Sequence, residues 1–197
     1  IVVDKFHIVQ LLTRELNKLR INEMKKLNTR SKEYKILKRY WKIPLTKNWE
    51  LNRIYFYKNR HFKNMTSSID ILDYMLKEFP NLKEAYDFYQ NFLLSISNND
   101  VAMLEDILNT RTDKIPMCFR KSIKTLKKLR KYVVNSLKYD YTNAMVEGKN
   151  NKIKVIKRVS YGYRSFRNFK ARIMLMERYK IQKGNIHSYK FAMDAAA

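Results

Sequence analysis

The sequence predicts a mainly α-helical fold with at most one or two short strands. Only three glycines and three prolines occur in 197 residues, whereas folds built from strands and tight turns need many more turn-forming residues. Apolar residues recur at intervals of three and four along most of the chain, which is the period of an amphipathic helix. Hydrophobic residues make up 45% of the chain, which is enough for a buried core.

The N-terminal third is expected to hold one strand and two helices. Ile1–Asp4 is an apolar run that ends in an acid, which predicts a short buried strand. A helix is expected from about His7 to Leu27, and a second helix should end before Pro44. Arg53–Tyr57 has weak strand propensity, since Asn and Lys surround it. The inward residues expected in the two helices are Val9, Leu12, Leu16 and Leu19, then Tyr34, Leu37 and Trp41.

Capping residues divide the middle of the chain into further helices. Ser68 is expected to cap a helix that Pro80 ends, and Asn81 to cap the next one. Either Asn99 or Asp100 should begin a third. Ile115-Pro116 then opens a long helix, whose apolar positions are Phe119, Ile123, Leu126, Leu129, Val133 and Leu137.

The C-terminal part should form two more helices around a break. Thr142 or Asn143 can cap the helix that holds Glu147, and Gly162 interrupts the chain. Ser165 is expected to cap the last helix, with Phe166, Phe169, Ile173 and Met176 facing inward.

Positive charge is large and unevenly distributed. The formal net charge is +24, with 42 Lys and Arg against 18 Asp and Glu. Residues 14–63 hold 16 bases and 4 acids, residues 70–113 hold 3 bases and 9 acids, and residues 114–183 hold 21 bases and 3 acids. Two basic segments around an acidic one indicate a body that binds a polyanion, with a central region that faces elsewhere.

Several classes of site are excluded or disfavoured by composition. The single cysteine, Cys118, excludes an intramolecular disulfide framework, fits a reducing cytoplasm and is more typical of a buried apolar residue than of a nucleophile. One Cys and three scattered His give no support to a zinc site. Three glycines leave no Walker-type or dinucleotide loop. No apolar run is long enough to cross a membrane.

One predicted helix face combines an acid with amides and bases. Helical spacing places Glu147, Asn150, Asn151, Lys154 and Arg158 on one stripe. Val146, Ile153 and Ile156 fall on the other side and can be buried. This pattern suggests a site for metal and phosphate. The alternative from the residues alone is a surface acid that pairs with Asn151 or Lys154.

A long C-terminal signature and three shorter motifs stand out in the sequence. The signature comprises Thr142-Asn143, Glu147-Gly148, Asn150-Asn151, Ile153-Lys154, Ile156-Lys157-Arg158, Tyr161-Gly162-Tyr163-Arg164 and Phe166. The shorter motifs are Asp4-Lys5-Phe6-His7, the stretch from Pro80 to Tyr86, and Ile115-Pro116. In these residues the sequence resembles the DDE-class transposases of bacterial insertion sequences of the ISL-three type. The resemblance covers essentially the whole chain, and its C-terminal signature is the specific part.

The resemblance implies an RNase-H-like catalytic core with a helical insertion. Residues 1–13 would be a remnant of that core, 14–138 the insertion, 139–183 the C-terminal core helices and 184–197 a tail. Three acids would hold two Mg²⁺ (or Mn²⁺) ions, with Asp4 matching the second and Glu147 the third. No residue matches the first acid, so the chain is expected to be part of a longer protein and inactive alone.

The resemblance also implies roles for neighbouring side chains. The expected DNA contacts are Asn151, Lys152, Lys154, Lys157, Arg158, Arg164 and Arg167, with His7 and Asn150 as possible auxiliary residues. Tyr161 and Tyr163 could stack on an unpaired base or pack at the Gly162 turn. From spacing alone, the favoured interpretation of Asp4 is an N-cap or first-turn acid of the following helix.

DNA transposition is the expected function, with Mg-dependent strand cleavage and transfer by the parent protein. The expected partners are transposon ends, target DNA and further copies of the chain, without a membrane, in the bacterial cytoplasm at the nucleoid. Two alternatives remain: a non-catalytic DNA-binding module, and a helical interaction domain that uses the acidic 70–113 segment for self-association.

Overall fold

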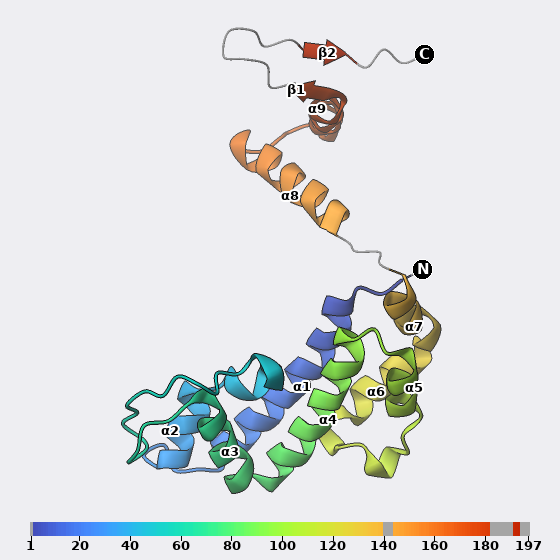
Figure 1. The fold of residues 1–197 in the computed structure, drawn as a ribbon. Helices are drawn as coiled ribbons and strands as arrows, with labels where there is room; N and C mark the ends of the chain where they lie inside the picture. Colours follow the sequence, from blue (N-terminus) through green and yellow to red (C-terminus); the bar gives the residue numbers. More distant parts are fainter. Residues whose placement is uncertain (1, 140–143, 182–190, 194–197) are drawn as a thin grey trace. The chain divides into compact units, whose positions relative to one another are not determined.

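The computed structural model describes residues 2–139, 144–181 and 191–193. It divides into a first unit, residues 1–141, and a second unit, residues 142–197 (Figure 1). Helices dominate both units, which confirms the mainly α prediction; the RNase-H-like core stays a prediction. The helices of the first unit are α1 (Lys5–Lys25), α2 (Lys32–Arg39), α3 (Ser68–Glu78), α4 (Pro80–Ser97), α5 (Val101–Asn109), α6 (Arg120–Lys128) and α7 (Arg130–Lys138). Short 3₁₀ helices are η1 (Ile43–Leu45), η2 (Asn48–Glu50), η3 (Thr112–Lys114) and η4 (Met117–Phe119).

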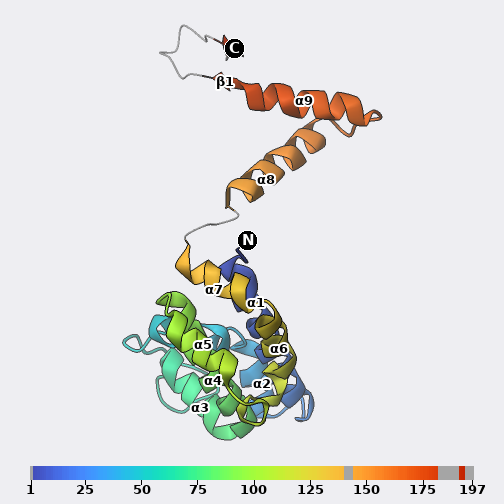
Figure 2. The same cartoon turned by 90° about the vertical axis from the view of Figure 1, so that its right-hand side faces the viewer.

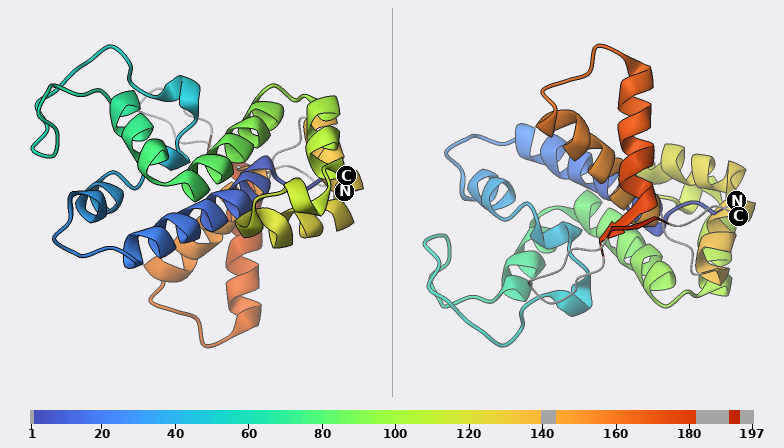
Figure 3. Two further views of the ribbon diagram at one scale, coloured as in Figure 1. Left: turned by 90° about the horizontal axis from the view of Figure 1, so that it is seen from below. Right: turned by 90° about the horizontal axis from the view of Figure 1, so that it is seen from above.

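The first unit is built around α1. This helix packs against α2, α4, α6 and α7, and the two views of Figure 3 show it running alongside α4. Leu12 and Leu16 of α1 are fully buried, as the apolar spacing predicts, whereas Val9 and Leu19 are half-buried. The hydroxyls of Thr13 and Tyr89 lie 2.8 Å apart and join α1 to α4 by a hydrogen bond. Burial of each large apolar side chain stabilises the fold by roughly 1.5–3 kcal/mol.

Helix starts follow the capping residues closely, with one exception. Ser67, one residue before the predicted Ser68, caps α3 in a capping box with Asp70. Asp100 caps α5 by accepting from the Met103 amide at 2.9 Å, as expected. The expectation for Asn81 is wrong, because α4 already begins at Pro80. Proline is well tolerated there, since the first helical amide has no intrahelical acceptor.

The predicted N-terminal strand is absent. Val2 and Val3 have no strand structure, and the Val3 amide instead donates to the Tyr132 carbonyl of α7 at 3.4 Å. The described part of the first unit offers no neighbouring strand, so an apolar run here is covered by helices. Arg53–Tyr57 is likewise not a strand: an isolated antiparallel bridge joins Tyr57 to Thr66.

The long helix predicted after Pro116 is interrupted at Leu129. Here α6 ends and α7 begins, with Leu129 at φ −99° and ψ 14°. The Leu129 amide donates to the carbonyls of Thr125 and Leu126, at 3.2 and 3.1 Å. Both helices contact α1. The interruption therefore lets α6 and α7 each pack on the core, which a single continuous helix would not do along its whole length. Trp41 also departs from expectation, because α2 ends at Arg39 and the indole is exposed.

The described residues of the second unit form two helices and a two-stranded ribbon. It consists of α8 (Ala144–Val159), α9 (Phe166–Arg178), β1 (Tyr179–Ile181) and β2 (Phe191–Met193), and β1 and β2 pair antiparallel with Lys180 opposite Ala192. Figure 2 shows the turn that joins α8 to α9. Gly162 breaks the chain as predicted: its φ of +103° and the φ of 51° at Tyr161 are left-handed values that end α8. Thr142 and Asn143 lie outside the described residues.

Membrane insertion has no support in the helices. None of them, within the described ranges, combines the length and apolar character that a bilayer span requires.

Candidate nucleic-acid interface and acidic residues

The acid, amide and base stripe lies on α8. The helix runs through every position from 147 to 158, so Glu147, Asn151 and Lys154 share one face by helical spacing. Asn150 and Arg158 complete the stripe, and all five side chains are exposed. The structure therefore places the predicted residues on an accessible surface.

The opposite face of α8 packs on α9 over part of its length. Ile156 is 5% exposed and Ile153 is half-buried, as predicted. Val146 is 57% exposed, contrary to the expectation that it can be buried. The Lys152 ammonium donates to the Met176 carbonyl at 3.1 Å, which places the last turn of α9 beside the middle of α8. Val146 lies more than one turn earlier, beyond that contact.

The turn between α8 and α9 separates the roles of two tyrosines. The hydroxyl of Tyr163 lies 2.7 Å from that of Ser160, and its ring lies 4.9 Å from the Phe169 ring. Tyr163 thus packs within the turn. The Tyr161 side chain is 100% exposed, so its ring is available to a ligand.

Positive charge dominates these two helices. Residues 144–176 contain nine basic residues and one acid, Glu147. The predicted DNA-binding residues Asn151, Lys152, Lys154, Lys157, Arg158, Arg164 and Arg167 are all exposed. Apart from Lys152, none of the nine bases forms an ion pair with a described residue. Such uncompensated charge is well suited to phosphate contacts.

Asp4 has a local structural role. It is the N-cap of α1, and its Oδ1 atom accepts from the Phe6 amide at 2.7 Å. The Asp4 carbonyl also accepts from the His7 amide at 3.1 Å. The His7 side chain is exposed, and its ring lies 5.5 Å from the Phe6 ring. The N-cap reading of Asp4 is therefore what the structure shows locally.

The two predicted metal ligands belong to different units. Asp4 precedes α1 in the first unit, and Glu147 lies in the first turn of α8 in the second. Within the described residues, no group of three or more His, Cys, Asp or Glu could hold a metal ion. The donors themselves suit Mg²⁺, which prefers carboxylate oxygens and retains several waters. The hydrogen bond that caps α1 uses Oδ1 of Asp4, which is one of the two oxygens of the carboxylate.

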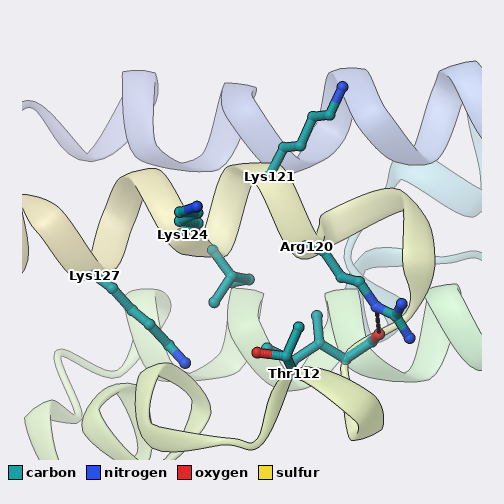
Figure 4. Close-up of a pocket in the computed structure, with 7 residues that line it drawn as sticks. Thr112, Arg120, Lys121, Lys124 and Lys127 are labelled. Carbon is teal, nitrogen blue, oxygen red and sulfur yellow. Dashed lines mark hydrogen bonds between the residues drawn. The ribbon is translucent and has the colours of Figure 1, made fainter.

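A hollow of about 370 Å³ lies beside α6 (Figure 4). Its lining comprises Thr112, Ile115, Arg120, Lys121, Ile123, Lys124 and Lys127. Arg120 Nε donates to the Ile115 carbonyl and Lys127 Nζ to the Thr110 carbonyl, both at 3.1 Å. Figure 4 shows Lys121 and Lys127 pointing to opposite sides of α6. Arg120 and Lys127 thus hold the 110–115 loop through its carbonyl groups. Lys121 and Lys127 do not converge on a shared point.

A second basic hollow was not anticipated from the sequence. It is lined by Thr29, Tyr34, Lys35, Lys38, Arg39 and Arg60, which come from α2 and two flanking loops. The spacing of Lys35, Lys38 and Arg39 was a local signal for a basic helix face. The approach of Arg60 depends on tertiary packing.

Comparison with known proteins gives a family and one partial relative. Residues 1–173 match the transposase family of the DDE class and ISL3 type. A Lactococcus lactis subsp. lactis protein named "ATP-dependent protease" is 39% identical over 121 residues, which are 61% of this chain and 38% of that protein. No solved structure gives a significant match. Because the family match spans most of its length, the chain belongs to the ISL3-type DDE transposases.

Proposed function

We propose that this chain acts in DNA transposition, with α8 and α9 holding the phosphate backbone of the DNA. The observation that carries the proposal is the pair of helices α8 and α9, which hold nine bases against two acids, with the predicted DNA-contacting side chains exposed. Lysine and arginine contacts to phosphates fix the position and register of DNA without reading its sequence. The residues proposed for this contact are Asn151, Lys152, Lys154, Lys157, Arg158, Arg164 and Arg167. Lys152 would exchange its bond to the Met176 carbonyl for a phosphate.

We also propose Asp4 and Glu147 as ligands of divalent metal, Mg²⁺ or Mn²⁺. Bound metal would supply charge stabilisation for cleavage and transfer of phosphodiester bonds. Glu147 is exposed on the same stripe as Asn150 and Lys154, so the acid lies beside groups suited to phosphate. His7 follows Asp4 by one helical turn and is exposed, which suits an auxiliary contact to the DNA.

The test separates cleavage from binding. Glu147→Gln in the full-length protein should abolish DNA cleavage and leave DNA affinity nearly unchanged, because the amide keeps the shape and loses the metal-binding charge. Lys154→Gln, on the same stripe, is the matched control and should weaken DNA binding. Equal cleavage by wild type and Glu147→Gln would remove Glu147 from the metal site.

The alternative is a DNA-binding or oligomerisation role without catalysis. It is favoured by the engagement of the Asp4 carboxylate in the α1 cap. It predicts steeply salt-dependent and sequence-independent DNA binding, with no Mn²⁺ affinity that depends on Asp4 or Glu147. Self-association through the acidic segment would be seen in sedimentation, where charge reversal at Asp87, Glu105 and Asp106 should abolish it. Glu105 already pairs with Arg130 at 3.2 Å, so its reversal also tests the α5–α7 contact.

Nucleotide binding, which the name of the Lactococcus relative implies for that protein, has no glycine-rich loop to support it in this sequence. A nucleotide-binding loop of the Walker type needs two glycines followed by Lys, and the three glycines of this chain, Gly148, Gly162 and Gly184, do not form one. ATP-dependent proteolysis therefore has no supporting motif in these 197 residues.

A further inference from the structure

The hollow beside α2 is lined mainly by basic residues. Its volume is about 460 Å³, and four of its six lining residues are Lys35, Lys38, Arg39 and Arg60. The other two, Thr29 and Tyr34, are uncharged. This α2 hollow lies within the first unit and shares no residue with α8 or α9.

The four cations come from two separate segments of the chain and line the same hollow. Lys35, Lys38 and Arg39 are exposed on α2, and Arg60 is exposed in the loop between η2 and α3. Arg60 Nε donates to Nε2 of His61 at 3.2 Å, so the guanidinium lies directly beside the imidazole. Burial lowers the pKa of His61, and the charges of Arg60, Arg39, Lys35 and Lys32 lower it further.

The arrangement is held by contacts that leave the cations available. The Lys32 ammonium lies 4.8 Å from the Phe62 ring centre and 4.5 Å from that of Tyr74, which ties the loop to α2 and α3. The His61 amide donates to Asn59 Oδ1 at 3.1 Å. Glu33, the acid of α2, accepts from the Tyr74 hydroxyl at 3.0 Å.

Carboxylates do not neutralise the hollow. Within the described residues, Lys35, Lys38, Arg39 and Arg60 form no ion pair. Lys38 and Arg39 lie over the rings of Tyr34 and Tyr40, at 5.6 and 5.7 Å, which orients them without cancelling their charge. Like charges brought together around a hollow repel one another, and a bound anion relieves that repulsion.

We propose that the α2 hollow binds the phosphate backbone of DNA and gives the first unit a DNA contact of its own. The inference rests on the proposed DNA function and extends it to a surface apart from α8 and α9. Arg39 and Arg60 supply planar forks that suit phosphate oxygens, and Lys35 and Lys38 add point charges along α2. A linear chain of phosphates can meet cations from both segments at once.

The test compares two charge-matched double variants of the whole chain. Arg39→Gln with Arg60→Gln removes two charges from the hollow; Lys77→Gln with Lys83→Gln removes two exposed charges from α3 and α4. Binding of a fluorescent DNA duplex is measured by anisotropy at several salt concentrations. The hollow variant should lose at least about tenfold in affinity, and its slope of log Kobs against log salt should fall by about 2, at roughly 0.9 per phosphate contact. The control variant should bind nearly as wild type.

A second measurement reads the hollow directly. The pKa of His61, followed by NMR, should rise when DNA binds, because phosphate offsets the nearby cations. A His61 pKa that does not change in the complex would overturn the inference.

The remaining outcomes separate this inference from the proposed function. If the hollow variant binds like the control while Lys154→Gln with Arg158→Gln loses affinity, the α2 hollow is not a DNA contact and the proposed function stands. If neither the hollow variant nor Lys154→Gln with Arg158→Gln loses affinity, the inference and the proposed function both fail. If the hollow variant keeps its DNA affinity and loses self-association in sedimentation, the hollow engages the acidic segment of a second copy and the inference is overturned.

Discussion

The Oδ1 atom of Asp4 accepts a hydrogen bond from the backbone amide of Phe6 at 2.7 Å. This bond satisfies one of the unpaired amides of the first turn of α1. The same carboxylate is the one proposed above as a metal ligand, so the capping role and the proposed metal role can be separated by substitution. Asp4→Ala should lower the free energy of unfolding by about 1 kcal/mol, since the cap acceptor is lost. Asp4→Asn keeps an acceptor and should cost much less.

Urea unfolding followed by circular dichroism measures both Asp4 variants. Mn²⁺ titration of the same proteins tests the proposed metal role of Asp4. Both Asp4→Asn and Asp4→Ala should lose Mn²⁺ affinity. Equal destabilisation by Asp4→Asn and Asp4→Ala would show that a hydrogen-bond acceptor at position 4 does not contribute to stability.

Tyr161 and Tyr163 should respond differently to substitution. Tyr161→Ala should weaken binding to DNA with an unpaired end by about 1–3 kcal/mol, because base stacking is lost, without changing stability. Tyr161→Phe keeps the ring and is the matched control. Tyr163→Ala should instead destabilise the second unit, since its ring contacts Phe169. Unchanged affinity of Tyr161→Ala for unpaired DNA would eliminate stacking.

The Cys118 thiol should be slow to alkylate. Burial raises its pKa to about 11. At pH 8.5 less than about 1% would then be thiolate, the reactive form. The rate of reaction with iodoacetamide should be about a hundredfold below that of a free thiol and should still rise above pH 10. Unfolding in urea should restore the ordinary rate, which serves as the control. Fast alkylation of the folded protein at pH 8.5 would contradict this expectation.

His61 should make stability depend on pH. Its pKa is lowered in the fold from its ordinary value of 6.5, mainly by burial. As pH falls below about 6.5, the unfolded chain takes up a proton before the folded one does, so stability is lost through that range. Urea midpoints at pH 7.5 and 5.5 measure the effect. His61→Gln should show a smaller difference between the two pH values, and a difference equal to that of wild type would assign the dependence to other groups.

Local signals predicted much of the helical fold. The stripe of Leu12 and Leu16, the Asp100 cap and the Gly162 break each depend on a few neighbouring residues, and the structure confirms all three. The break at Leu129 could not be predicted this way, because the apolar period continues through it. It reflects the course of the core around α1. The strand prediction for Ile1–Asp4 fails at Val2 and Val3, because a short apolar run before an acid fits a strand or a half-buried lead into a helix equally well.

The candidate site shows the same division. Periodicity alone placed Glu147, Asn151 and Lys154 on one exposed face of α8. The approach of Arg60 to α2 was invisible, because it depends on how the loop packs over Phe62 and Tyr74. The environments of the two tyrosines after α8 also depended on the turn. Tyr161 is fully exposed, whereas Tyr163 is half-buried against Phe169.

The central position of α1 has a consequence for the nascent chain. This helix is synthesised before the other helices of the first unit, yet the Val3 amide meets Tyr132, and the buried stripe of α1 is covered partly by α6 and α7. The chain through Tyr132 must therefore be synthesised before α1 acquires its last neighbours. Until then Leu12 and Leu16 form an incompletely covered apolar surface, and translation speed between residues 100 and 138 sets how long chaperones have access to it.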